Sequence, residues 1–423
     1  MKDYLLRLLR RLGAYTKTDM VYLASGAFYA LLTQAVVLCG VLALSIVVGH
    51  YFPKAAYGEY KFVLSIIALL SVFSLNGVGS AVLQSAAQGY RSALPHGFSA
   101  NLRWSIGIVL GAAALATYYF AMGNARLAEE ILLGGAFVPL ITSGSLFTPF
   151  LSGMKDFPRQ ARYGIIDNLI PIAFLIVAVL LTNSALVLVA TYFVANALAA
   201  LFFYYRTRRA YPSDGRADTG LLHYGKHLSI MGVLAGIADN LDQILLFHFV
   251  GPAELAVYNF AIAIPDQVRA PAKNLDSILQ ARFVGRTDSE IKVGMRNKFF
   301  WYLIFSIAAT VAYVVLAPHI FHYLFPQYAD AIRYSQLYAL WILTLPLDPA
   351  YTYLAARKRI KELYATNIFT IIVQISFLAI GVIGWGLIGV IIAKIASRAV
   401  GAVSTYWFYR KALNSPDTLP NTP

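Results

Sequence analysis

The feature that most limits how this chain can fold is the length of its segments without a charged side chain. The runs Asn168–Tyr205 and Leu363–Ala393 carry no formal charge. As one helix, at 1.5 Å per residue, the first run would be about 57 Å long, far beyond a hydrocarbon core of about 30 Å. Each run must therefore fold back on itself. We expect the turns at Thr182–Ser184 and Gly384–Gly386, where residues that favour turns interrupt the apolar sequence.

The composition extends this argument to the whole chain. Only 13% of the residues are charged, whereas a soluble domain carries roughly 25%. A membrane span needs about 20 consecutive apolar residues. The sequence therefore predicts an all-α integral membrane protein. We place twelve spanning helices at residues 21–48, 60–83, 104–122, 131–152, 165–182, 185–205, 228–250, 256–280, 299–317, 332–355, 363–384 and 387–409.

The distribution of positive charge predicts the orientation. The net charge of +14 would also fit a nucleic-acid-binding protein. However, most Lys and Arg residues fall in alternate loops and at the two ends of the chain, whereas few lie in the remaining loops, namely Lys54, Lys61, Arg126 and Arg333. The side whose loops are rich in Lys and Arg is the cytoplasmic side. We therefore expect both termini in the cytoplasm and no nucleic-acid partner.

The longest polar stretch inside the chain divides the twelve spans into six and six. The predicted organisation is an amphipathic surface helix at 1–20, a first lobe at 21–205, a cytoplasmic linker at 206–227, a second lobe at 228–409 and a cytoplasmic tail at 410–423. A frayed basic tail is the alternative for the first segment. Residues 47–66 and 245–264 also resemble each other at a constant offset of 198, with His50 matching His248 and Tyr60 matching Tyr258. We interpret the two lobes as a pseudo-symmetric repeat, an arrangement in which transporters form a central site.

Charged residues inside the spans are the candidate functional groups, because each one costs about 2.5–3.5 kcal/mol unless it has a partner or a wet cavity. Lys394 and Arg398 lie one helical turn apart on one face of the last span. Two interpretations stay open for them: they contact a substrate in the cavity, or they pair with Asp239 or Asp242. The eighth span, kinked at Pro265 and Pro271, carries further charges that either reach the cavity or pair within the helix, as Asp266 with Arg269 and Lys273 with Asp276. The candidate sets are the cavity cations Lys394, Arg398, Arg269 and Lys273, the ion-coupling carboxylates Asp239, Asp242 and Asp266, and the cavity amides Asn76, Asn259, Asn367 and Gln374.

The chain resembles the polysaccharide-transport flippases, which transfer O-antigen and capsular oligosaccharides. The resemblance rests on the twelve spans, the polar seventh span ADNLDQILLFHFVGPAELAVYNFA (238–261), the YGEY sequence at 57–60 and LNGVGSAVLQSA at 75–86. This family belongs to the superfamily of the multidrug-extrusion (MATE) and lipid II transporters. The resemblance implies a V-shaped, two-lobed fold around a central cavity. It also implies movement of an undecaprenyl-diphosphate-linked oligosaccharide across the bacterial inner membrane, towards the periplasm, by alternating access for surface polysaccharide biosynthesis.

Two other functions compete with that of a flippase. An ion-coupled multidrug exporter would favour a cavity with more carboxylates than cations. Lys394 and Arg398, which have no carboxylate on their own helix, argue against such a cavity. A membrane enzyme would need reactive groups, and we find no phosphate-binding glycine loop, metal-ligand cluster or nucleophile triad in the sequence. The sequence thus predicts a non-enzyme with no metal site and no cofactor beyond coupling to H⁺ or Na⁺. Expected partners are the lipid-linked oligosaccharide, inner-membrane lipids and the polysaccharide polymerase machinery, and the expected state is a monomer.

Overall fold

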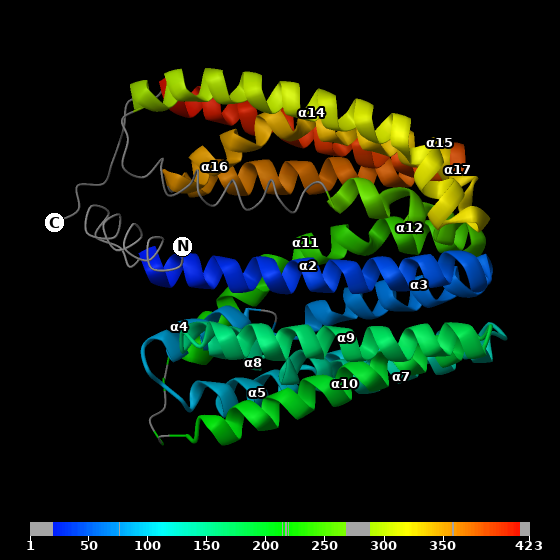
Figure 1. The fold of residues 1–423 in the computed structure, drawn as a ribbon, viewed down its shortest axis with the longest axis vertical. Coiled ribbons are helices and arrows are strands. Elements are labelled where there is room, and N and C mark those ends of the chain that lie inside the picture. Colours follow the sequence, from blue (N-terminus) through cyan, green and yellow to red (C-terminus); the bar gives the residue numbers. More distant parts are fainter. Residues whose placement is uncertain are drawn as a thin grey trace, which may run out of the picture. The chain divides into compact units, whose positions relative to one another are not determined.

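A computed structural model of the chain describes residues 20–75, 77–213, 220–267, 288–357 and 359–414, together with Gly215 and Asp218. The described residues form helices joined by short turns, with no strand among them (Figure 1). In chain order the elements are α2 (Met20–Tyr51), α3 (Lys54–Leu70), η1 (Ser71–Phe73), α4 (Val78–Ala87), α5 (Ala93–Trp104), α6 (Ile106–Ala121), α7 (Ala125–Gly144), α8 (Phe147–Gly153), α9 (Phe157–Leu181), α10 (Ala185–Ala210), α11 (Leu221–Phe249), α12 (Pro252–Gln267), α14 (Asp288–Leu324), η2 (Pro326–Tyr328), α15 (Ala331–Tyr338), η3 (Ala339–Leu347), α16 (Asp348–Ala356) and α17 (Ile360–Asn414).

The predicted all-α membrane fold is confirmed. Eight helical stretches within the described residues are long and apolar enough to cross a membrane. The last of them, Ile360–Leu413, has 54 residues and would measure about 81 Å as one straight helix, which is more than two membrane crossings. Each of the twelve predicted ranges falls mainly on helix wherever it is described.

Both predicted turns are present. Helix α9 ends at Leu181 and α10 begins at Ala185, so the first charge-free run folds back at residues 182–184. The second run turns inside α17, where Gly386 has φ 56° and ψ −132°. A positive φ of this size is strained for residues with a Cβ. Gly386 therefore divides α17 into two limbs, residues 360–385 and 387–414.

Three predicted spans are less regular than expected. The second is interrupted between η1 and α4, and the tenth consists of α15, η3 and α16 in place of one helix. Pro346 lies inside η3 and Pro349 near the start of α16. Proline lacks the N–H of an α-helical hydrogen bond, so it favours such breaks. In the eighth span α12 is described up to Gln267 and contains Pro265, whereas Pro271 lies outside the described residues, as does most of the predicted surface helix at 1–20.

The chain forms two compact units. Unit 1 comprises residues 1–52 and 63–237, and unit 2 comprises residues 53–62 and 238–423. Helix α3 therefore contributes its first turns to unit 2, and α11 contributes its first part to unit 1. The six-plus-six lobe boundaries proposed from the sequence stay a prediction.

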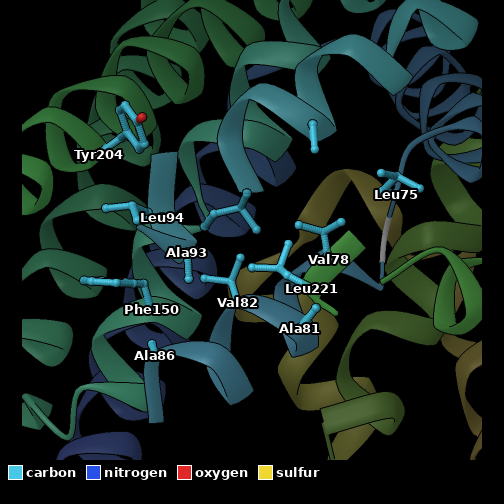
Figure 2. Close-up of a cluster of buried hydrophobic side chains, with 12 residues drawn as sticks. Leu75, Val78, Ala81, Val82, Ala86, Ala93, Leu94, Phe150, Tyr204 and Leu221 are labelled. Atoms are coloured by element: carbon cyan, nitrogen blue, oxygen red, sulfur yellow. The ribbon is translucent and has the colours of Figure 1, made fainter. Parts of the chain in front are cut away.

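Unit 1 has a buried apolar cluster to which the short helices α4, α5 and α8 contribute most of the side chains (Figure 2). Val78 and Val82 of α4, Leu94 of α5 and Phe150 of α8 are fully buried in it. Leu221 at the start of α11 also belongs to this cluster. Together with the hydrogen bond from the Gly77 N–H to Ser229 Oγ (2.9 Å), this contact fixes the first part of α11 within unit 1.

The internal repeat has a structural counterpart. Helices α2 and α11 end at Tyr51 and Phe249, and the helices that follow begin at Lys54 and Pro252. Both pairs of boundaries differ by the same 198 residues that separate the matching sequences. His50 Nδ1 lies 2.8 Å from the Ile46 carbonyl oxygen, and His248 Nδ1 lies 2.9 Å from the Ile244 oxygen at the equivalent position. The two segments thus share local geometry as well as sequence.

Candidate functional site

The candidate site lies in unit 2 and is organised by the second limb of α17. Lys394 and Arg398 project from the same face of this limb because four residues are slightly more than one helical turn. Gly401, whose position approaches Thr370 of the first limb, and the buried Thr405 continue this face. Each of the two cations has a carboxylate partner in unit 2.

Lys394 forms the more buried of the two ion pairs. Its ammonium donates to Asp242 Oδ2 on α11, and the side chains are 14% and 1% exposed. The Tyr258 hydroxyl on α12 donates to the same Oδ2, while Lys394 Nζ lies 2.9 Å from the Tyr258 oxygen. The Gln243 N–H donates to Asp242 Oδ1 at 2.8 Å. Both carboxylate oxygens are thus hydrogen-bonded, as a buried charge requires.

Arg398 forms a second pair that is more accessible. Its Nη1 and Nη2 both lie 3.2 Å from Asp266 Oδ1 on α12, and the two side chains are 23% and 33% exposed. The Tyr338 hydroxyl donates to the same oxygen at 2.9 Å. Asp266 Oδ2 receives no hydrogen bond from any residue that the structure describes. Both terminal nitrogens of the guanidinium therefore converge on one oxygen, which differs from the parallel two-oxygen arrangement that Arg forms with a carboxylate or phosphate.

Aromatic rings cover the guanidinium of Arg398. The centroids of the Tyr338 and Trp341 rings lie 5.3 and 4.5 Å from the Arg398 Cζ. Trp341 is buried in η3, and its indole N–H has no hydrogen-bond partner among the described residues. Rings at this distance attract a cation and orient the guanidinium. Arg398 is therefore held by one acid and two aromatic faces.

The other predicted polar residues occupy different environments. Asp239 is exposed and forms no ion pair within the described part of the chain. Gln374 Nε2 donates to the Ala238 carbonyl at 2.9 Å, which ties the first limb of α17 to α11. Asn259 donates to the Leu255 carbonyl of its own helix at 2.9 Å, and Asn367 is exposed. Gln374 and Asn259 thus have structural hydrogen bonds.

Three of the predicted site residues, Arg269, Lys273 and Asn76, lie outside the described residues, as does Asp276. The proposed pairing of Asp266 with Arg269 stays untested for that reason, whereas the bond from Arg398 to Asp266 was not anticipated. Of the two interpretations of Lys394, the structure contains the pair with Asp242. Among the described residues, no group of three or more His, Cys, Asp or Glu side chains is arranged to hold a metal ion.

The acidic residues of the site belong to one half of the repeat. At the offset of 198, Tyr258 corresponds to Tyr60, but Asp242 corresponds to Leu44 and Asp266 to Ala68. The helical framework is thus repeated, whereas the ionised groups are not. Since the first half forms its helices without acids at these positions, the fold itself does not require Asp242 and Asp266.

The aromatic partners Tyr258, Tyr338 and Trp341 were missed in the sequence. Tyr258 and Asp266 are eight residues apart and lie within about 80° of each other on α12, so helical spacing alone was a usable signal for Tyr258. No comparable signal exists for the other two rings. They belong to the irregular tenth span, where the α-helix α15 is followed by the 3₁₀ helix η3 and the number of residues per turn therefore changes.

Known proteins share this fold. A family model described as polysaccharide biosynthesis protein matches residues 52–284, more than half of the chain. A multidrug resistance MATE family transporter of the MOP superfamily in an inward-facing conformation aligns with a TM-score of 0.71 at 16% identity, covering 88% of this chain and 94% of that one. A MATE family transporter in an outward-facing conformation gives 0.64 at 16% identity, with 93% and 95% covered.

A MOP superfamily transporter from Pyrococcus furiosus, described as having a binding pocket of reversed polarity, gives a TM-score of 0.63 at 14% identity over 93% of this chain and 95% of that one. No curated protein sequence matches the chain. The structural similarities establish a MATE-like fold for this multi-pass integral membrane protein. The family match over α3 to α12 and beyond establishes more: the chain belongs to the polysaccharide biosynthesis protein family.

Proposed function

We propose that the protein is a flippase that moves an undecaprenyl-diphosphate-linked oligosaccharide from the cytoplasmic to the periplasmic leaflet of the bacterial inner membrane. Membership of the polysaccharide biosynthesis family supports the glycan, and the transporter fold supports movement across the membrane. Both termini are cytoplasmic in this proposal, in accordance with the distribution of Lys and Arg.

The observation that carries the proposal is the hydrogen-bonding arrangement of the Arg398 guanidinium. Its two terminal nitrogens share one oxygen of a partly exposed acid, Asp266. A diphosphate offers several oxygens in the spacing that a guanidinium binds bidentately, and it carries more charge than one carboxylate. The cargo therefore competes with Asp266 for Arg398. Tyr338 and Trp341 keep the guanidinium in place during the exchange.

The buried pair has a different role in this proposal. Lys394, Asp242 and Tyr258 satisfy one another, so this group holds α11, α12 and α17 together. Arg269 and Lys273 remain proposed cavity cations. Alternating access, in which the repeats rock around the cargo, is the mechanism that such folds use. The protein's own groups act by binding and release, and no bond in the cargo is broken.

Coupling to an ion is assigned to the acids. Asp239 is exposed on α11, and Asp266 loses its cationic partner when the cargo takes Arg398. A carboxylate released from its cation inside a membrane span can bind the coupling ion. Asp239 and Asp266 are therefore the proposed sites of proton coupling. Sodium binding at the same oxygens is the alternative result of the test below.

The test uses purified protein in proteoliposomes that contain a fluorescently labelled undecaprenyl-diphosphate sugar in one leaflet. Transfer is followed by quenching with a reagent that does not cross the bilayer. Arg398→Ala should reduce transfer by about 10- to 100-fold, because it removes a charged hydrogen-bonding group. Arg206→Ala, at an exposed position on α10, is the matched control and should transfer normally. A pH or sodium gradient identifies the coupling ion.

Two results would contradict the proposal. One is an Arg398→Ala protein that transfers the lipid as fast as the control. The other is a wild-type protein that moves no diphosphate lipid but extrudes cationic dyes from the same vesicles, which would assign it to the multidrug exporters.

A further inference from the structure

Unit 2 contains an apolar cleft outside the two ion pairs. It has a volume of about 660 Å³ and lies between the two limbs of α17. Its walls are Ala365 and Phe369 from the first limb and, from the second, the segment from Ala399 to Phe408. No charged residue lines it. Cavities of this size hold ligands as large as drug molecules or lipid chains.

The cleft and the ion pairs are formed by different residues of the second limb, and the cleft lining reaches from Ala399 to Phe408. Trp407 follows Arg398 by nine residues, which corresponds to about 180° around the helix. Trp407 and Val403 are 57% and 60% exposed. Neither Lys394 nor Arg398 lines the cleft, so a ligand there can be tested separately from the proposed cargo.

The two limbs are antiparallel, and their alignment is fixed by contacts along their length. A Cβ on Gly401 would lie 2.8 Å from Thr370 Cγ2, and Arg359 Nη2 lies 3.5 Å from the Ala412 carbonyl oxygen. Both pairs fit one antiparallel register, because the numbers of opposing residues in such a register always have the same sum. The free ends of both limbs are therefore at one end of the cleft, with residue 361 opposite residue 410.

That end of the cleft is basic. Lys361 precedes Ala365 by one turn on the first limb, and Arg410 and Lys411 follow the lining residues Trp407 and Phe408 by three residues each. All three cations are exposed. Lys411 Nζ lies 5.4 Å from the centroid of the Trp407 ring. The nearby acid Glu362 is occupied by Arg359, with 3.7 Å between Nη1 and Oε1.

We propose that this cleft binds an anionic phospholipid, with an acyl chain between the limbs and the headgroup phosphate at Lys361, Arg410 and Lys411. The lining segment of the second limb is about 14 Å long, close to half of a hydrocarbon core of about 30 Å. One acyl chain of one leaflet therefore fits along it. Basic groups at the membrane surface next to apolar clefts between helices attract anionic lipids. This lipid site is separate from the proposed cargo site.

The experiment compares lipid binding by native mass spectrometry of the full-length protein in detergent. The probes are phosphatidylglycerol and phosphatidylcholine with the same acyl chains. Wild-type protein should retain phosphatidylglycerol at least about tenfold more strongly. The variant K361Q/R410Q/K411Q should lose that preference, since each basic group contributes about fivefold to anionic lipid binding. The control R103Q/R206Q/R209Q removes three exposed charges elsewhere and should keep it.

A second variant tests the cleft without changing charge. Ala365→Phe fills part of the lining and should reduce retention of both lipids while leaving the thermal unfolding temperature near that of the wild type. Equal losses in K361Q/R410Q/K411Q and in the control would show that the charge effect is nonspecific and overturn the proposal. Displacement of phosphatidylglycerol by a neutral polyprenol would also overturn it, because the cleft would then bind the prenyl tail. Failure of lipid binding leaves the transfer assay with Arg398→Ala unaffected, so the two proposals are tested separately.

Discussion

Breaking the buried ion pair should destabilise unit 2 strongly, while neutralising both partners should not. Asp242 is 1% exposed and Lys394 is 14% exposed, so either charge alone would remain in a poorly solvated position. Removal of one partner of a buried pair costs about 3–5 kcal/mol, whereas replacement of both by uncharged groups of similar volume is often neutral. We therefore expect Lys394→Met or Asp242→Asn alone to lower the free energy of unfolding by about 3–5 kcal/mol.

The double variant D242N/K394M should be clearly more stable than either single variant. The amide that replaces the carboxylate at position 242 keeps an oxygen that can accept from the Tyr258 hydroxyl or the Gln243 N–H, and no lone charge remains. The assay is unfolding of the purified protein in mixed micelles with increasing dodecyl sulfate, followed by tryptophan fluorescence. Because the double variant should lose less stability than either single variant, the coupling energy from the double-mutant cycle should exceed about 3–5 kcal/mol, which is above the usual range for residues of one network. Losses that simply add would refute the reasoning, because they would mean that neither residue depends on the other.

Three further predictions concern packing, coupling and the covered guanidinium. Gly389→Ala should destabilise the hairpin by about 1–3 kcal/mol in the same unfolding assay, because the added Cβ would lie 1.9 Å from the Gly381 carbonyl oxygen of the opposite limb. The control Gly384→Ala, with open space around the added Cβ, should have little effect. Equal losses of stability in the two variants would contradict this packing. Asp239→Asn combined with Asp266→Asn should make transfer in proteoliposomes independent of pH or sodium gradients, and unchanged coupling would remove these acids from the mechanism. Trp341→Leu should weaken binding of the diphosphate lipid by about 2- to 30-fold through loss of the cation–π contact, measured by lipid-dependent thermal stabilisation, and unaltered binding would show that the ring has no part in orienting the guanidinium.

Charge-free segments made the membrane fold predictable. The turns at residues 182–184 and at Gly386 follow from the length of apolar sequence that a bilayer accepts. The repeat could also be read, since His50 and His248 lie in matching sequences and form matching contacts. What the apolar periodicity did not reveal are the breaks in the second and tenth spans. An apolar run looks the same in sequence whether it forms an α-helix or a 3₁₀ segment.

The candidate site was predictable in its residues but not in its pairings. Lys394 and Arg398 stand out because charges are rare inside spans. Asp242 was named as one partner of Lys394, but Asp266 was assigned to a residue of its own helix, since sequence spacing reveals neighbours within a helix only. The choice between partners depends on how α11, α12 and α17 are packed together. Tyr338 and Trp341 were missed for the same reason.

The most direct test of the flippase proposal is the rate at which Arg398→Lys and Arg398→Ala proteins transfer undecaprenyl-diphosphate-linked sugar, compared with undecaprenyl-monophosphate-linked sugar. If the guanidinium binds the diphosphate through two parallel hydrogen bonds, lysine should restore only part of the rate, and the preference for the diphosphate should fall in both variants. A preference that both variants retain in full, at the wild-type rate, would contradict the account.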